Sequence, residues 1–272
     1  MSLDLVRSKI LKNESEIWLH RYFSSKYLDN VIENNSLNIR FSAFDTFSDG
    51  LEGWDYRIKN IKKAINEMAL FNNRVIKDNG VIEAIDCLEL ILIENHSEGH
   101  FDKKLVKENI LERKRHYVSC WFSSNTNSSE SRIMWDIYAK KRNEIGLKVS
   151  IKWLDLKEAL IKSDVNFRAG LVNYVSDENP ADSDYMFLKD ISYEHERELR
   201  IIIKKDSPKN KYEEMKFDIN IFKNLFVTVE NSHNNQDVIN RLEKLGFSKS
   251  HGFSKTYNVS KLLPEFLKYK EN

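Results

Sequence analysis

The chain has 272 residues, of which 41% are hydrophobic and 31% are charged, so it can bury a sizeable core and disorder is not expected. Its 43 Lys and Arg residues nearly balance its 42 Asp and Glu residues, and the formal net charge of +1 argues against a general nucleic-acid coat or a polybasic membrane anchor. Two cysteines are too few for a disulfide scaffold. Because no signal peptide or long apolar stretch is visible, we expect a soluble, cytoplasmic protein that binds no membrane.

Apolar periodicity along the chain predicts a mixed α+β fold. Runs rich in aromatic or alternating apolar residues predict strands at 17–23, 37–41, 117–122, 146–151, 171–175, 199–203 and 225–229. Apolar residues at helical spacing predict helices at 27–32, 133–139 and 238–245. The same spacing recurs between Tyr56 and His116, so we expect residues 56–116 to form a helical insertion within a single domain that spans residues 1–272.

Charged residues occur in the first strand and in the loop that follows the second strand. Arg21, within His20-Arg21-Tyr22, is costly to bury unless it is paired or faces a cleft; a solvated sheet face is the alternative that the sequence alone favours. Asp49 and Glu52 lie in a glycine-bearing loop, where two carboxylates could position a substrate hydroxyl or a metal. A simple Asp-Gly turn is the alternative that the local pattern favours.

A further candidate, Tyr138, lies on the helix predicted at 133–139. Its side chain is amphipathic, so it could either pack against the core or lie on a pocket wall and stack on a planar ring. Both interpretations stay open.

The strand that includes Glu196, Glu198 and Arg200 carries the most specific pattern of charge. A period of two places these three side chains on one face, which suits either an anion-guided active site or a solvent-facing charge ladder. Two neighbouring carboxylates disfavour double ionisation, so we expect the pKa of one of them to rise. Arg200 would oppose that rise and keep the site anionic.

No metal site is predicted. His96 and His100 are four residues apart, but Gly99 interrupts the helix that would align them and no third ligand is evident. The chain also lacks a Walker A loop, a G-x-G-x-x-G motif and a G-x-S-x-G motif, which disfavours P-loop NTPases, Rossmann enzymes and serine hydrolases.

A series of short motifs runs through most of the chain, from about residue 18 to residue 229. They are Arg21-Tyr22, Phe47 with Asp49 and Glu52, Ser119-Cys120-Trp121-Phe122-Ser123, Met134-Trp135 with Tyr138-Ala139, Gly146, Lys189, and Glu196 with Glu198 and Arg200. In this order they resemble a bacterial family catalogued as domain of unknown function 2971. Ser48 stands where that family has Asn, and Gly50 where it has Pro, so this loop departs from the family pattern.

The opening of the chain, His20-Arg21-Tyr22-Phe23-Ser24 with a short helix and a strand into Phe41-Ser42, is similar to the opening of ADP-ribosyltransferase folds. This second resemblance implies a largely antiparallel sheet core and NAD as co-substrate. It implies NAD-binding roles for His20, Arg21, Tyr22, Ser42, Tyr138 and Arg200, a catalytic role for Glu198 with Glu196 as its partner, and a substrate-loop role for Asp49 and Glu52. The acceptor would be an unknown macromolecule, either a protein or a nucleic acid.

The leading hypothesis is therefore an NAD-dependent ADP-ribosyltransferase-like enzyme, with a toxin or an anti-phage defence effector as its setting. It predicts that Arg21, Tyr138 and Glu198 converge on one cleft, with Arg21 and Glu198 on the same face of the sheet, and a placement on opposite faces would contradict it. One alternative is a metal-dependent nuclease that uses Asp49, Glu52 and the Glu196–Glu198 pair around a hard cation. Another is a non-catalytic sensing or interaction module.

Overall fold

The structure is a computed structural model, and it describes residues 14–47, 52–54, 103–139, 144–176, 184–208, 210–230, 235–247 and 251–255. The strands are β1 (Trp18–Ser24), β2 (Ile32–Glu33), β3 (Ser36–Ala43), β4 (His116–Ser124), β5 (Gly146–Lys152), β6 (Phe167–Leu171), β7 (Asn173–Val175), β8 (Leu188–Asp190), β9 (Glu198–Lys204), β10 (Tyr212–Asp218), β11 (Phe226–Val229) and β12 (His251–Phe253). The α-helices are α1 (Leu28–Val31), α4 (Lys103–Arg115), α5 (Arg132–Met134), α6 (Trp153–Lys162) and α7 (Gln236–Lys244). Short 3₁₀ helices are η1 (Glu14–Glu16), η2 (Ser25–Tyr27), η3 (Phe44–Thr46), η6 (Tyr185–Phe187), η7 (Ile191–Glu196) and η8 (Ile219–Ile221), and η5 (Trp135–Ala139) is a π-helix.

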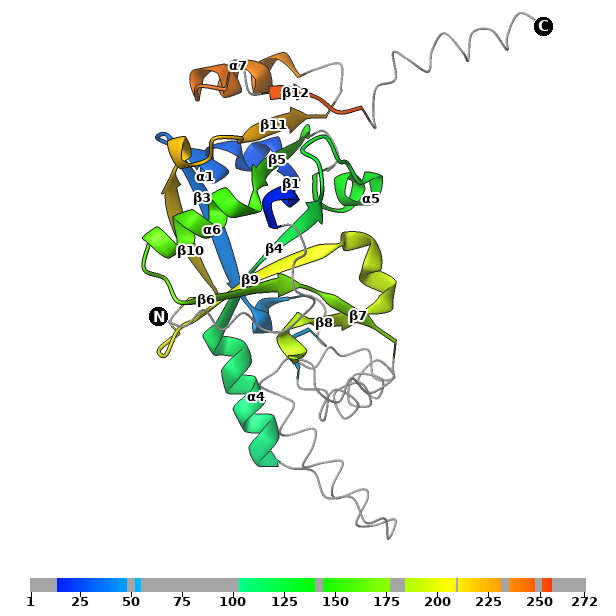
Figure 1. Ribbon diagram of the computed structural model, residues 1–272, viewed down its shortest axis with the longest axis vertical. Coiled ribbons are helices and arrows are strands. Elements are labelled where there is room, and N and C mark those ends of the chain that lie inside the picture. The colour runs from blue at the N-terminus through cyan, green and yellow to red at the C-terminus, as the bar shows by residue number, and fades with distance from the viewer. Residues whose placement is uncertain are drawn as a thin grey trace, which may run out of the picture.

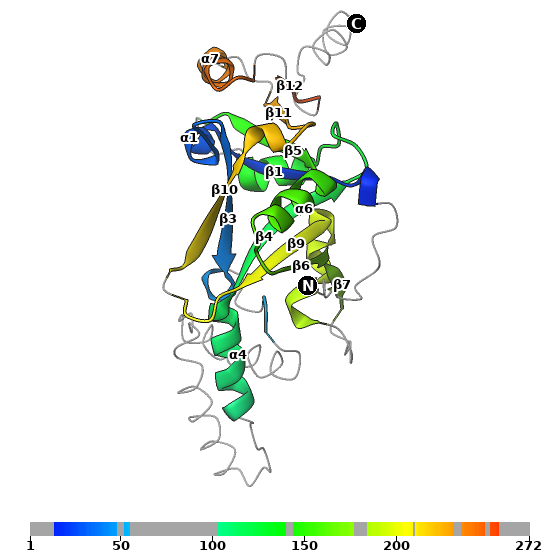
Figure 2. The ribbon, with the colours of Figure 1, turned by 60° about the vertical axis from the view of Figure 1, so that its left-hand side comes forward.

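Ten strands of the described residues form one curled sheet (Figures 1 and 2). Its main path runs β10-β3-β4-β1-β5-β11-β12, while β9 pairs with both β4 and β6, and β2 pairs with β3. Every pairing in this sheet is antiparallel except that of β11 with β12. Strands β7 and β8 form a separate parallel pair. These pairings confirm the predicted mixed α+β fold with a largely antiparallel sheet.

Strand β4 is the branch point of the sheet. One of its edges pairs with β9 from His116 to Phe122. The other edge pairs with β3 only at Tyr117 and Val118, and with β1 only from Phe122 to Ser124. On this edge, residues 119–121 of β4 have no strand partner within the described part of the chain, because β1 and β3 diverge there. We call the region bounded by β1, β3 and residues 119–121 the fork.

The main hydrophobic core lies on one face of the sheet. Leu199, Ile201 and Ile203 alternate along β9 and point into this core. Helix α6 covers the same face with Trp153 and Leu156, which are three residues apart and therefore on one side of the helix. Full burial of an aliphatic side chain such as that of Leu156 contributes about 1.5–3 kcal/mol to stability. The intervening residues of β9 consequently lie on the opposite face, and the polar site lies there.

The predicted elements agree with the structure in most of the described segments, with three differences. The strand expected at 171–175 is divided: β6 ends at Leu171, and β7 begins at Asn173 in the second sheet. Helix α6, the edge strand β10 and the short strands β2, β8 and β12 were not predicted. Of the insertion expected at 56–116, the structure describes residues 103–116, where α4 is helical and His116 already begins β4; residues 56–102 lie outside the described residues.

Helix α4 projects away from the sheet (Figure 1). None of the helices in the described ranges is both long and apolar enough to cross a membrane.

Candidate functional site

A cavity of about 490 Å³ lies at the fork and extends to the start of β9. Its volume is within the range of small-molecule sites. Of the residues that the sequence singled out, His20, Arg21, Tyr22, Ser42, Glu52, Tyr138, Glu196 and Glu198 line this cavity. Arg200 lies behind the wall, in contact with two of these carboxylates, and Asp49 is outside the described residues. The expected convergence of Arg21, Tyr138 and Glu198 on one cleft is therefore observed.

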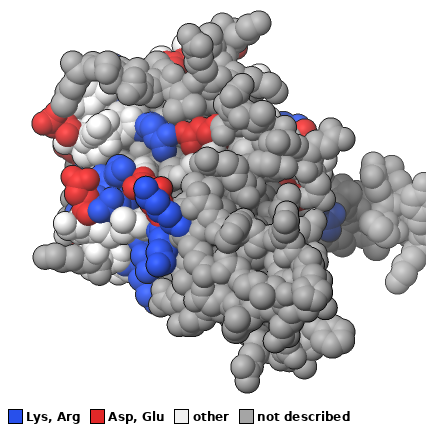
Figure 3. Space-filling view, turned by 90° about the horizontal axis from the view of Figure 1, so that it is seen from below, with Lys and Arg blue, Asp and Glu red and all other residues white. Residues whose placement is uncertain are grey.

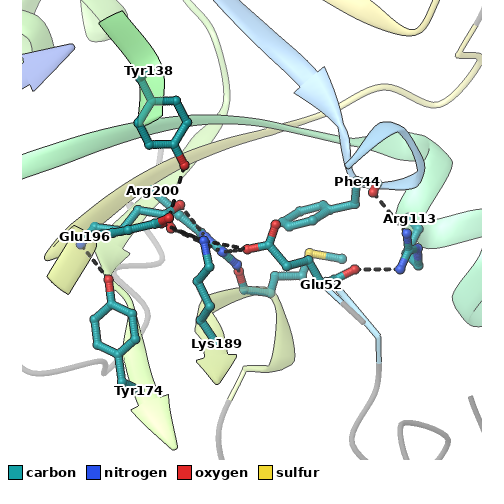
Figure 4. Close-up of polar contacts among 10 residues, drawn as sticks. Phe44, Glu52, Arg113, Tyr138, Tyr174, Lys189, Glu196 and Arg200 are labelled. Carbon is teal, nitrogen blue, oxygen red and sulfur yellow. Dashed lines mark hydrogen bonds and ion pairs between the residues drawn. The ribbon is translucent and has the colours of Figure 1, made fainter. Parts of the chain in front are cut away.

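Three carboxylates and two cations form a buried cluster in the cavity wall (Figure 4). Lys189 Nζ lies 2.6 Å from Glu196 Oε2, 3.2 Å from Glu52 Oε1 and 3.3 Å from Glu198 Oε2. Arg200 Nε lies 2.8 Å from Glu198 Oε1, and its Nη2 donates to Glu52 Oε1. With all five groups ionised, three negative and two positive charges give a formal charge of −1. We call these five residues the acid cluster.

Glu196 joins the acid cluster by a different route from the one that strand alternation predicted. It ends the 3₁₀ helix η7, and the next residue, Arg197, has a left-handed backbone with φ 41°. Strand β9 begins only at Glu198, so the expectation that Glu196, Glu198 and Arg200 share one strand face is wrong for Glu196. The turn brings its carboxylate beside Glu198 through the shared contact with Lys189.

The pKa of Glu198 lies well below its usual range. Burial alone would raise it, but the charges of Arg200 and Lys189 and the hydrogen bonds to the carboxylate outweigh burial. Conversely, the carboxylates hold the pKa of Lys189 above its usual value even though burial would lower it. The expected rise of one carboxyl pKa is therefore not found at Glu198, because Arg200 and then Lys189 offset the repulsion between the carboxylates.

Arg200 is a fully buried member of the acid cluster. Its Nη1 donates to the carbonyl of Met186 at 2.7 Å, and its other nitrogens meet Glu198 and Glu52. Because it is absent from the cavity lining, it acts on the cavity through the carboxylates that it holds, and a direct contact with a ligand is not supported.

Two tyrosines bind the acid cluster from opposite sides (Figure 4). Tyr138 Oη donates to Glu196 Oε1 at 3.0 Å, and 43% of the residue remains exposed at the cavity. It lies on the π-helix η5, a type of distortion that is frequent at functional sites. Tyr174, on β7, accepts a hydrogen bond from the Glu198 backbone N–H at 2.8 Å. Tyr174 therefore fixes the first residue of β9, a role that no sequence pattern had indicated.

Arg21 and Arg40 bring two guanidinium groups to the same cavity. Arg21 lies with its Cζ 5.8 Å from the centre of the Trp121 ring, and Arg40 lies with its Cζ 3.8 Å from the centre of the Tyr212 ring. Neither forms an ion pair with a carboxylate of the described residues. Burial lowers the pKa of Arg21 from its usual value, but an arginine remains charged at neutral pH. Arg21 Nη1 donates to the Arg40 carbonyl at 3.5 Å, and Glu214, which pairs with Arg40 across β10 and β3, also lines the cavity. The cavity therefore has two cationic groups without an ion pair in the described ranges.

The prediction that Arg21 and Glu198 share a sheet face is wrong. Glu198 pairs with Phe122, and Phe122 pairs with His20, so it is His20 that leaves β1 on the face of Glu198. Arg21 leaves on the other face, beside the core residue Trp121. It still lines the cavity because β1 and β4 separate beyond His20, which opens the sheet at the fork. The two side chains therefore share a cavity although they do not share a sheet face, so only the convergence part of the prediction supports the proposed function.

His20 and Tyr22 already have protein partners. His20 is fully buried, and its Nδ1 and Nε2 lie 2.8 Å and 2.7 Å from the hydroxyls of Ser150 and Ser124. Burial and the nearby Lys148 lower the pKa of His20 to about 3, so the ring is neutral at pH 7 and cannot attract an anion by charge. Tyr22 Oη accepts a hydrogen bond from the backbone N–H of Ser131 at 3.0 Å. Both residues therefore shape the cavity wall more than they offer groups to a ligand.

Within the described residues, no group of three or more His, Cys, Asp and Glu side chains has a geometry that could hold a metal ion. The carboxylates of Glu52, Glu196 and Glu198 instead meet Lys189 and Arg200. Comparisons with family models, with curated proteins and with solved structures found no match to this chain.

Proposed function

We propose that this chain is an ADP-ribosyltransferase-like enzyme that uses NAD as its co-substrate. The observation that carries the proposal is that one cavity joins a buried cluster of net negative charge to two guanidinium groups without carboxylate partners in the described segments. NAD has the matching division of charge, with an anionic pyrophosphate and a nicotinamide ribose that becomes cationic during reaction. Arginine is well suited to bidentate binding of phosphate oxygens.

In the proposed reaction, the charge that develops on the substrate has a group of opposite charge in the cavity. The bond between the nicotinamide nitrogen and the ribose C1′ breaks, and its electron pair leaves with nicotinamide. Positive charge then develops on the ribose, and the net negative acid cluster, with Glu198 at its centre, stabilises that charge where it forms. A nucleophile of the acceptor, or water, forms the new bond to C1′ and releases a proton. The exposed ring of Tyr138 is available to stack on nicotinamide.

The motifs behind the family resemblance also support the proposal. Glu52, Lys189 and the Glu196–Glu198–Arg200 group belong to separate parts of the chain, yet they meet in the acid cluster. A shared site gives a physical reason for these motifs to occur together, so we extend the proposal to membership of the domain of unknown function 2971 family.

The metal-dependent nuclease is the weaker alternative. Glu52, Glu196 and Glu198 would each have to exchange a contact with Lys189 or Arg200 for a hard cation. A sensing module would use the two guanidinium groups to bind an anion, but it leaves the buried negative charge of the acid cluster without a role. Neither alternative is favoured by a specific contact.

Thermal unfolding with ligands tests the proposal directly. NAD at about a hundredfold excess over its dissociation constant should stabilise the protein by about 2.7 kcal/mol, and nicotinamide should appear in the solution. Arg21→Gln should weaken this stabilisation. Arg132→Gln is a matched control because the Arg132 side chain is 77% exposed and is absent from the cavity lining.

A protein whose unfolding midpoint ignores NAD and that releases no nicotinamide would contradict the proposal. A midpoint that rises with Mg²⁺ alone, together with cleavage of nucleic acid, would favour the nuclease. Equal responses of Arg21→Gln and Arg132→Gln would contradict the assignment of Arg21.

A further inference from the structure

Arg113, on the last turn of α4, reaches into the loop that carries Glu52 (Figure 4). Its Nη1 donates to the carbonyl of Glu52 at 2.5 Å, and its Nη2 donates to the carbonyl of Phe44 at 3.0 Å. Its Cζ lies 4.9 Å from the centre of the Trp54 ring, and the residue is 1% exposed. One guanidinium group therefore holds both ends of the segment between Phe44 and Glu52.

The turn that follows Glu52 fits closely against Phe44. Gly53 has φ +70°, a conformation that favours glycine, and a Cβ at this position would lie 2.6 Å from Phe44 Cδ1. Because the Phe44 carbonyl is itself bound by Arg113, the glycine turn and the arginine fix the same pair of segments. The backbone of Glu52 has one well-defined position as a result.

From that position the Glu52 carboxylate reaches Arg200 and Lys189, the two cations of the acid cluster. We propose that Arg113 is a positioning residue for the acid cluster: it places Glu52 against Arg200 and Lys189, and so connects α4 to the cavity. Any consequence for NAD turnover rests on the proposed function, whereas the placement of Glu52 does not.

The planar guanidinium is suited to this role because it offers two donors at fixed spacing to two carbonyls. A lysine at position 113 would keep the charge but could not reproduce both hydrogen bonds. Arg115, on the same helix, provides a matched control, because its side chain is 32% exposed and its Nη1 lies 3.6 Å from Glu112. The surface around α4 has Lys and Arg side chains beside Asp and Glu (Figure 3), and Lys204 meets Glu112 there.

The thiol of Cys120 reports on Glu52 without any assumption about function. Cys120 lines the cavity and pairs with Arg200 across β4 and β9. Burial raises the pKa of this thiol, and the charges of Glu198 and Glu52 raise it further. Withdrawal of Glu52 should therefore lower the thiol pKa and increase the thiolate fraction. A Cys87→Ser background leaves Cys120 as the one remaining cysteine of the chain.

The experiment measures the rate at which a neutral maleimide labels Cys120 at fixed pH. A fall of one unit in the thiol pKa should speed labelling by about tenfold. We expect that increase in Arg113→Lys and in Glu52→Gln, and no change in Arg115→Lys. Adding Arg113→Lys to Glu52→Gln should give no further increase, because Arg113 acts through Glu52. Arg113→Gln, which keeps one donor, serves as the second variant if Arg113→Lys does not fold.

Two results would overturn the proposal: unchanged labelling in Arg113→Lys, or the same increase from Arg113→Lys in both the wild-type and the Glu52→Gln background. The second result would mean that the substitution only loosens the protein. Under the proposed function, NAD turnover should fall about tenfold in Arg113→Lys, again with no further loss in the double variant. A wild-type protein that consumes no NAD would contradict the proposed function alone, since labelling decides the role of Arg113.

Discussion

Replacing Glu198 by Gln tests the acid cluster most directly, because it removes one charge and keeps the shape of the side chain. In the structure both carboxylate oxygens accept hydrogen bonds: Oε1 from Arg200 Nε at 2.8 Å, and Oε2 from Lys189 Nζ at 3.3 Å. A Gln side chain has one oxygen, so its amide NH₂ must face one of these two donors. The formal charge of the acid cluster changes from −1 to zero.

The expected loss of stability follows from that geometry. Losing one charge-assisted hydrogen bond costs about 1.5–3 kcal/mol, which corresponds to about 5 °C in the melting midpoint of a chain of this size. The folded-state pKa of Glu198 is lowered, so its carboxylate stabilises the protein above the pKa of the unfolded state, and this contribution is lost as the pH falls through the folded-state pKa. The difference in the free energy of unfolding between wild type and Glu198→Gln should therefore be largest near pH 7 and should decrease below about pH 4.5.

Under the proposed function, Glu198→Gln should also reduce the rate of nicotinamide release by about 10²–10³-fold, the usual effect of losing one preorganised electrostatic contact. NAD affinity should change little, because the guanidinium groups of Arg21 and Arg40 remain. Glu194→Gln, an exposed residue of η7, is the matched control and should leave both rate and stability unchanged. Full nicotinamide release by Glu198→Gln would refute its catalytic role, and an unchanged melting midpoint would refute the energetic account of the acid cluster.

Three further predictions concern neighbouring residues. Lys189→Met should change the formal charge of the acid cluster to −2 and lower the free energy of unfolding in urea by about 3–5 kcal/mol. Adding Glu196→Gln should restore part of that free energy, and no recovery would contradict the charge argument. Tyr138→Ala should raise the KM for NAD about tenfold while Tyr138→Phe does not, whereas equal effects would exclude ring stacking. His20 has a lowered pKa, so wild-type stability should fall from about pH 6.5 towards pH 3, and His20→Gln should flatten that profile in acid titrations followed by circular dichroism.

The sequence predicts the interior strands well because burial on one face leaves a period-two pattern, as in Leu199, Ile201 and Ile203. Strand β10 shows that pattern only weakly because it is an edge strand, in which Phe217 is buried and Met215 is partly buried. Helix α6 was missed although Trp153 and its partners at helical spacing carried the signal. No local sequence pattern indicates the fork, because it forms where the strand partner of β4 changes from β3 to β1.

The site was only partly visible in the sequence for a similar reason. Period two relates Glu198 to Arg200 correctly, but the left-handed backbone of Arg197 moves Glu196 off the strand, and a non-glycine residue gives no warning of that conformation. Lys189 was indicated as a site residue only by the family resemblance. Arg113 is 61 residues from Glu52, so their contact depends on the path of α4 and no short motif could indicate it.

Under the proposed function, the net charge of the acid cluster distinguishes it from a structural ion-pair network. Buried ion pairs contribute little net stability, because desolvation offsets most of their attraction. A purely structural cluster would gain from equal numbers of charges, whereas within the described residues the acid cluster holds three carboxylates against Lys189 and Arg200. Its excess negative charge lines a cavity whose other groups include Arg21 and Arg40, so a ligand that is cationic at one end and anionic at the other would complement both. Burying the excess negative charge of the acid cluster costs free energy. Under the proposed function, binding of such a ligand and of the positive charge that develops on it offsets that cost.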